Sequence, residues 1–145
     1  MTPVRLVFAV VLIGMVATTA RGQARAPDSS EAVSEALVNR VSTAFTDGDA
    51  QELLTPAADR VEVSLFGTRT FYSSAQAFYV LDDFFDRHPP TRFELGDVTK
   101  AGRSCFVRGR FGDRRDERTL QVYVRLVHRE AAWQLQEVRV DADVE

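Results

Sequence analysis

The residues best suited to acid–base chemistry in this sequence are carboxylates on one predicted helix. Asp82 and Asp86 are one helical turn apart, a spacing that can hold two carboxylates near one ligand. Asp83 and Arg87, however, stand at positions i and i+4, which is the spacing of an ordinary surface ion pair. We therefore expect Asp82 and Asp83 to lie on a solvated helix face.

A histidine on a predicted strand is the second candidate for acid–base chemistry. His128 continues the alternating row of apolar residues that runs from Leu120 to Leu126, so its side chain is expected to point the same way as that row. An imidazole titrates near neutrality, which suits a general base. Because such rows usually reach the surface where a strand ends, we expect His128 to be exposed.

Other kinds of chemistry lack the residues that they need. A metal site requires several converging ligands, but the chain has two histidines, one cysteine and no short ligand spacing, so we expect no metal and no cofactor. Cys105 has no histidine near it in the sequence that could activate it as a nucleophile. Gly109 is interpreted as a strand kink and Gly102 and Gly112 as turns, not as parts of a phosphate-binding loop.

Composition indicates one globular domain. The 145 residues are 45% hydrophobic and 27% charged, which is the usual balance for a soluble domain. Seventeen of the eighteen basic residues are arginine, and they are interleaved with Asp and Glu instead of forming a block. This pattern argues against nucleic-acid binding and favours a solvated sheet face.

The beginning of the chain has the layout of a secretory signal peptide. Residues 6–17 form an unbroken apolar run after Arg5, shorter than the roughly 18 to 20 apolar residues that span a bilayer. We expect residues 1–24 to be cleaved off after Ala24, with export to the periplasm or the medium and no membrane attachment afterwards.

Cys105, the only cysteine, can form no intramolecular disulfide and is too distant to accept a lipid, so we expect it to be buried. Residues 25–30 are predicted to be a linker and residues 31–145 one domain.

The elements that would position the candidate residues are helices followed by a run of strands. We predict helices over residues 31–46 and 51–54, a long helix capped by Ser73 or Ser74 and ended by residues 88–90, and strands over 60–66, 69–72, 91–100, 103–111, 119–129 and 133–141. Turns are expected at residues 67–68, 101–102, 112–117 and 130–131. The long helix carries one apolar stripe for the core: Ala77, Phe78, Leu81, Phe84 and Phe85. The apolar phase changes along the last strand, which predicts a bulge near Gln136 and Glu137.

Three segments, FTDGDAQELL, YSSAQAFYVLDDFF and WQLQEVRV, occur within this order of elements. With them, residues 30–140 resemble the nuclear transport factor 2-like, or cystatin-like, superfold, and within it the exported bacterial family named domain of unknown function 4783. The resemblance implies an α+β fold in which a curved antiparallel sheet wraps around helices as a cone. Such cones often have an apolar cavity at the wide mouth and often form dimers through the outer sheet face.

Some members of this superfold are isomerases, dehydratases or hydrolases that place an Asp, His or Tyr inside the cone. The residues that we consider for this role are Tyr72, Tyr79, Asp82, Asp83, Asp97, Tyr123 and His128. The resemblance carries no catalytic residue over to this chain.

Three functions fit these expectations. We favour a non-enzymatic exported domain that binds a small apolar ligand, a peptide or a protein through the cone or the outer sheet face, because the predicted lining is apolar. The first alternative is an isomerase- or hydrolase-type enzyme whose base is His128 or a helix carboxylate, beside a hydrogen-bond donor such as Tyr72. The second alternative is a structural dimer in which Tyr123 and Arg125 belong to a sheet-to-sheet interface.

Overall fold

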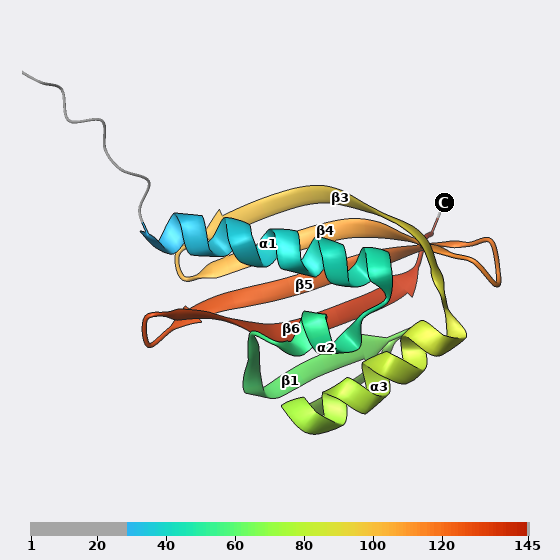
Figure 1. The fold of residues 1–145 in the computed structure, drawn as a ribbon, viewed down its shortest axis with the longest axis horizontal. Coiled ribbons are helices and arrows are strands. Elements are labelled where there is room, and N and C mark those ends of the chain that lie inside the picture. The colour runs from blue at the N-terminus through green and yellow to red at the C-terminus, as the bar shows by residue number, and fades with distance from the viewer. Residues whose placement is uncertain (1–28, 145) are drawn as a thin grey trace, which may run out of the picture.

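A computed structural model describes residues 29–144, and the side chains from residue 35 onward (Figure 1). The elements in chain order are α1 (Ser29–Asp47), α2 (Ala50–Leu54), β1 (Ala57–Leu65), β2 (Thr68–Ser73), α3 (Ser74–Arg87), β3 (Pro90–Ala101), β4 (Ser104–Asp113), β5 (Thr119–Arg129) and β6 (Ala132–Ala142). The predicted signal peptide and residues 25–28 of the predicted linker lie outside the described residues. No helix of the described part is long and apolar enough to cross a membrane.

The six strands form one sheet, in the order β2-β1-β6-β5-β4-β3. All three helices cover the same face of this curved sheet, so the predicted α+β fold is confirmed (Figure 1). We call the helix-covered face the inner face and the opposite one the outer face. The sheet is antiparallel except where β1 runs parallel to β6, a pairing that the sequence did not predict.

The sheet is bent at one residue of β6. Arg125 pairs with Glu137 and Leu126 with Leu135, so Gln136 is an extra residue in β6, as the change of apolar phase predicted. The pairing of β1 with β6 is irregular at the same place, because Ala57 pairs with Leu135 and the next pair joins Glu62 to Glu137. Residues 58–61 of β1 thus face the single residue Gln136, and the ladder is interrupted there.

The long helix α3 begins at a capping box. The Ser73 hydroxyl accepts a hydrogen bond from the Gln76 N–H, and the Gln76 side chain accepts one from the Ser73 N–H. The helix ends at Arg87, and prolines 89 and 90 prevent its continuation. Phe84 and Phe85 are 3% and 5% exposed, so the predicted apolar stripe faces the core.

Phenylalanine rings fill the space between the helices and the sheet. Phe45 is fully buried, and its ring centroid lies 5.2 Å from that of Phe93, 5.7 Å from Phe85 and 6.2 Å from Phe111. A Cβ atom on Gly109 would overlap the Phe93 ring, so this glycine permits a close contact, where the sequence suggested a strand kink. The core is therefore closed by aromatic packing at this point.

Two predicted turns differ from the structure. The β1–β2 turn consists of Phe66 and Gly67, whose φ angles are +51° and +84°, and Thr68 already belongs to β2. Phe66 adopts this conformation while its N–H donates to the Val140 carbonyl. Gly112 lies inside β4, where a Cβ atom would meet the Thr91 hydroxyl, so the β4–β5 turn begins after Asp113.

Candidate functional site

The helix carboxylates lie on the solvent side of α3. Asp82 and Asp83 are exposed, and the Arg87 Nε lies 3.1 Å from the Asp83 Oδ2, which is the predicted surface pair. Tyr79 on the same helix is 72% exposed. None of these three side chains faces the interior.

The remaining candidates are distributed over both sheet faces. His128 pairs with Trp133 on the inner face, at the end of β5, and is half-buried with its ring centroid 5.3 Å from the indole. Tyr72 is also half-buried and packs against the core, but on β2. Asp97 and Tyr123 lie on the outer face. Among the described residues, no hydrogen bond or ion pair joins two of the seven candidates, so they form no acid–base constellation.

The structure brings together a pair that the sequence did not reveal. The His88 Nδ1 lies 2.6 Å from the Asp113 Oδ2, at the point where α3 ends and β4 ends. Asp113 is 2% exposed, and its other oxygen accepts a hydrogen bond of 2.9 Å from the Arg115 N–H. The Phe84 ring centroid lies 4.9 Å from the imidazole. Because the two residues are distant in sequence, His88 could be recognised only as part of a helix stop.

Hydrogen bonds control the ionisation of Asp113. Burial alone would raise the pKa of this carboxyl, but the His88 side chain and the N–H groups of Arg115 and Asp116 outweigh that effect and hold it below 3.8, its ordinary value. Asp113 is therefore an anion at neutral pH.

An oriented His–Asp pair is also part of many hydrolytic sites. His88 lines none of the four hollows of the described surface, although Asp113 lines one of about 460 Å³ beside the β4–β5 turn. Side-chain atoms of His88, Asp113 and Asp116 lie within 4.8 Å of one another, but both Asp113 oxygens already have partners. The His88–Asp113 contact instead joins the end of α3 to the β4–β5 turn. A second contact between the same two segments is the hydrogen bond from the Arg114 N–H to the Pro89 carbonyl.

The outer face carries most of the polar chemistry of the sheet. The side chains that alternate with the buried row on each strand are Arg60, Glu62, Arg69, Phe71, Phe106, Arg108, Arg110, Gln121, Tyr123, Arg125, Arg129, Glu137, Arg139 and Asp141. Glu62 and Glu137 are only 8% and 7% exposed. Arginines cover both carboxylates, since the Arg69 Nε lies 2.7 Å from Glu62 and the Arg139 Nη2 lies 2.9 Å from Glu137.

Tyr123 near the centre of this face is unsuited to act as a base. Burial and the charge of Glu137 raise the pKa of its hydroxyl, although three neighbouring arginines oppose the shift. The group therefore remains a neutral hydrogen-bond donor. It borders two hollows of about 350 and 370 Å³ that both include Arg108.

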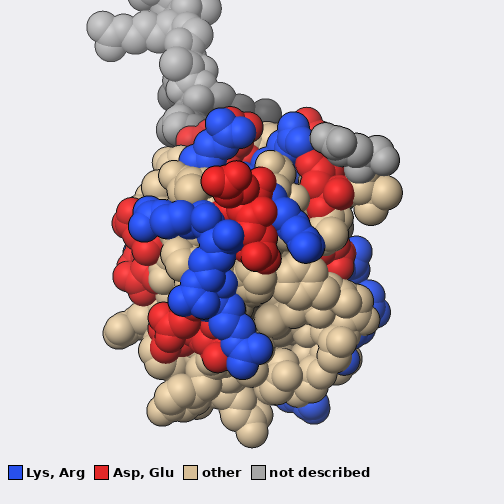
Figure 2. All heavy atoms as spheres, turned by 90° about the vertical axis from the view of Figure 1, so that its right-hand side faces the viewer, with Lys and Arg blue, Asp and Glu red and all other residues tan. Residues whose placement is uncertain are grey.

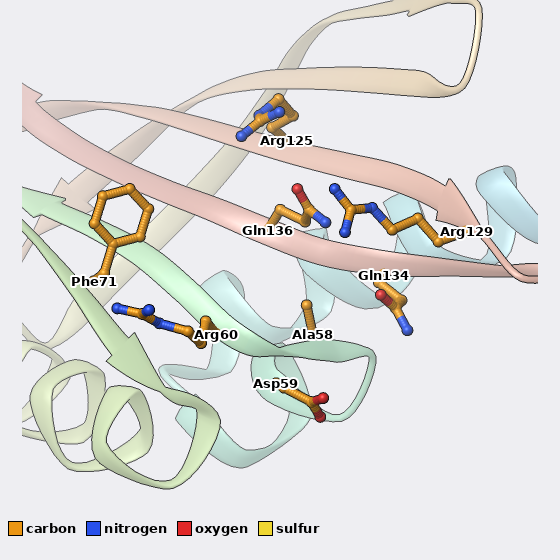
Figure 3. Close-up of a pocket in the computed structure, with 8 residues that line it drawn as sticks. All are labelled: Ala58, Asp59, Arg60, Phe71, Arg125, Arg129, Gln134 and Gln136. Carbon is orange, nitrogen blue, oxygen red and sulfur yellow. The ribbon is translucent and has the colours of Figure 1, made fainter.

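A larger hollow of about 490 Å³ lies where the β1–β6 ladder is interrupted (Figure 3). We call it the arginine groove, and it is lined by Ala58, Asp59, Arg60, Phe71, Arg125, Arg129, Gln134 and Gln136. The extra residue of β6 and the widened part of β1 both contribute to its wall. The groove is thus a product of the sheet irregularity, not of a loop.

The three arginines of the groove differ in their partners. The Arg125 Nε lies 3.3 Å from Glu137, and the guanidinium of Arg60 lies over the Phe71 ring, 5.8 Å from its centroid. Within the described residues, neither Arg60 nor Arg129 has a carboxylate within 4.0 Å. Two guanidinium groups are therefore available to an anionic ligand.

The end of the molecule with the β4–β5 turn has a different charge pattern. Figure 2 views this end, and positive and negative side chains alternate over its charged part. The Arg110 Nη2 lies 2.6 Å from the Asp143 carboxylate, and hydrogen bonds from Gln121 and Arg110 lower the pKa of Asp143. Arg110 thus has an acidic partner, which Arg60 and Arg129 lack among the described residues.

Comparison with known proteins identifies relatives by sequence and by fold. The family model described as domain of unknown function (DUF4783) matches residues 38–141. A search of curated proteins gives no match. A DUF4783 family protein from Bacteroides ovatus is 24% identical, with a TM-score of 0.69 over 73% of this chain and 94% of its own. One from Bacteroides uniformis is 22% identical, with a TM-score of 0.69 over 74% and 97%. A cystatin-like domain of unknown function from Nostoc punctiforme is 14% identical, with a TM-score of 0.62 over 83% and 81%.

Proposed function

Because this chain belongs to the DUF4783 family, whose fold is shared by proteins of unknown function, we propose a role from its surface: it is a non-enzymatic domain that binds an acidic polypeptide on the outer face of its sheet. The observation that carries this proposal is the pair of guanidinium groups, Arg60 and Arg129, that lack carboxylate partners beside a hollow on that face.

The interior offers less support for a ligand site. The rings of Phe45, Phe93 and Phe111 pack against one another between the helices and the sheet. An apolar small molecule would have to displace such rings, each of which stabilises the fold by burying its surface. We therefore propose that the binding surface is the outer face of the sheet and not the interior of the cone.

Charge supports an acidic partner. The chain has a formal net charge of −3, yet its outer sheet face carries several arginines, and two acids of that face, Glu62 and Glu137, are already covered. A local positive surface on an acidic protein attracts an acidic segment while the net charge disfavours unspecific contact. We also propose export, which the signal-peptide pattern of residues 1–24 predicts. These residues lie outside the described part of the chain.

The alternatives make different demands on the same residues. An enzyme would need a substrate space beside an oriented base, and the half-buried His128 has only Trp133 as a described aromatic neighbour. A structural dimer would cover Tyr123 and Arg125 with a second copy, which would make the state of the outer face depend on protein concentration.

Titration of the ¹⁵N-labelled protein with poly-L-glutamate tests the proposal. We expect amide shifts to concentrate on outer-face residues of β1, β5 and β6, and to vanish at about 1 M NaCl, where the Debye length is about 3 Å. A neutral glycine–serine peptide is the control and should leave the spectrum unchanged. Shifts confined to the helices, or no shifts at all, would contradict the proposal. Sedimentation at two protein concentrations separates a dimer from a bound polypeptide.

A further inference from the structure

We infer that the arginine groove is a subsite for two carboxylates of an acidic peptide segment, one bound by Arg60 and the other by Arg129. This inference rests on the proposed function and specifies where on the outer face the acidic partner is held. It concerns side chains that no described hydrogen bond or ion pair occupies.

The backbone explains why a groove exists here. Between the pairs Ala57–Leu135 and Glu62–Glu137, residues 58–61 of β1 face Gln136 alone. The strands therefore separate, and side chains from both border the opening (Figure 3). A regular ladder would bring neighbouring strands within about 5 Å of each other and leave no hollow between them.

The two available guanidinium groups are on different sides of this opening. Arg60 comes from β1 and Arg129 from β5, and Gln136 lies between them in Figure 3. Asp59 is the only carboxylate among the lining residues, and Figure 3 shows it at the β1 rim, directed away from the guanidinium groups. The separation of the two cations suits two anionic groups better than one.

The chemistry of the wall favours glutamate side chains. A guanidinium binds a carboxylate through two parallel N–H···O contacts, which gives both strength and orientation. Phe71 is 57% exposed at the edge of the groove and offers its ring to the methylene groups of a glutamate. Gln134 and Gln136 supply amides that can bind a peptide backbone.

Arg125 has a supporting position instead. Its Nε lies 3.3 Å from the Oε2 of Glu137, which is 7% exposed, so replacing Arg125 would leave a buried carboxylate with fewer partners. Within the groove, only Arg60 and Arg129 are therefore replaced, because neither has such a partner among the described residues.

Binding of tetraglutamate tests the inference. We expect a dissociation constant of about 1 mM or lower, read from amide shifts of Gln136 and its neighbours. Arg60→Ala and Arg129→Ala should each weaken binding about tenfold, the factor that corresponds to ~1.4 kcal/mol. Arg60→Lys keeps the positive charge but lacks the two parallel N–H donors of a guanidinium, so this variant should bind tetraglutamate more weakly than wild type. Arg118→Ala, at the opposite end of the sheet, is the matched control and should bind as wild type; thermal unfolding shows that each variant is folded.

Three results would overturn the inference in distinguishable ways. If tetraglutamate binds but only Arg108→Ala weakens it, the acidic partner lies elsewhere on the outer face, so the subsite is wrong and the proposed function stands. If pyrophosphate binds at Gln136 and tetraglutamate does not, the groove takes phosphate groups instead of peptide carboxylates. If neither tetraglutamate nor poly-L-glutamate binds, the proposed function fails together with the subsite.

Discussion

Replacing Asp113 by alanine should destabilise the protein more than replacing any surface carboxylate by alanine would. The carboxylate is 2% exposed and lies 2.6 Å from the His88 ring and 2.9 Å from the Arg115 N–H. It joins the end of α3 to the β4–β5 turn, so its removal loosens two elements that are distant in the sequence.

The magnitude follows from these contacts. A hydrogen bond to a charged group contributes about 1.5–3 kcal/mol, and the Asp113 carboxylate has two such contacts, one with His88 and one with the Arg115 N–H. Arg115 is exposed, so water can satisfy its N–H after the substitution. We therefore expect the free energy of unfolding at pH 7 to fall by about 3 kcal/mol, the lower end of the range for two such hydrogen bonds.

The contribution should also depend on pH with a defined sign. The pKa of Asp113 is lowered in the folded state, so the unfolded state binds a proton at a higher pH than the folded state does. The stabilisation is complete above the unfolded value near 3.8 and is lost as the pH falls through the lower folded value. The difference between wild type and Asp113→Ala should therefore shrink in this acid range.

Urea unfolding measured by circular dichroism between neutral and acidic pH is the assay. Asp83→Ala is the control, because the Asp83–Arg87 pair is exposed and should contribute less than about 1 kcal/mol. A double-mutant cycle with His88→Ala should give a coupling energy of at least about 1 kcal/mol. The reasoning is refuted if Asp113→Ala costs no more than Asp83→Ala, or if its cost grows as the pH falls.

Two further predictions concern the core. Phe84→Ala and Phe85→Ala should each lower the free energy of unfolding by about 3–5 kcal/mol in the same urea assay, because both rings are buried. Tyr79→Ala, on the exposed side of α3, is the control and should change the free energy of unfolding little. A loss below about 1 kcal/mol at Phe84 or Phe85 would contradict the described packing. Cys105 is fully buried, and burial raises the pKa of its thiol, so we expect a thiol reagent such as dithionitrobenzoate to react only after unfolding; rapid reaction with the native protein would show that the strand opens locally.

Local patterns predicted the elements of this fold well. The apolar stripe of α3, its serine cap and the bulge at Gln136 were all predicted, because each depends on residues within a few positions of one another. The resemblance to the nuclear transport factor 2-like superfold then indicated how these elements combine.

Long-range relations were missed for a physical reason. The parallel pairing of β1 with β6, the His88–Asp113 contact and the arginine groove each join segments that are far apart in the chain. Hydrophobic periodicity indicates which side of a strand is buried, but it does not say which strand lies beside it. The candidate site could therefore be described only with the sheet order known.

The sheet order also has a consequence for how the protein folds. The hairpin β1–β2 and the meander from β3 to β6 each consist of strands that follow one another in the chain, whereas the β1–β6 junction pairs residues as distant as Ala57 and Leu135. Closing such a long loop costs entropy before its contacts form, so we expect the two units to form first and to dock afterwards. The arginine groove lies on this seam, so a peptide that joins Arg60 of one unit to Arg129 of the other would hold the late-forming junction closed.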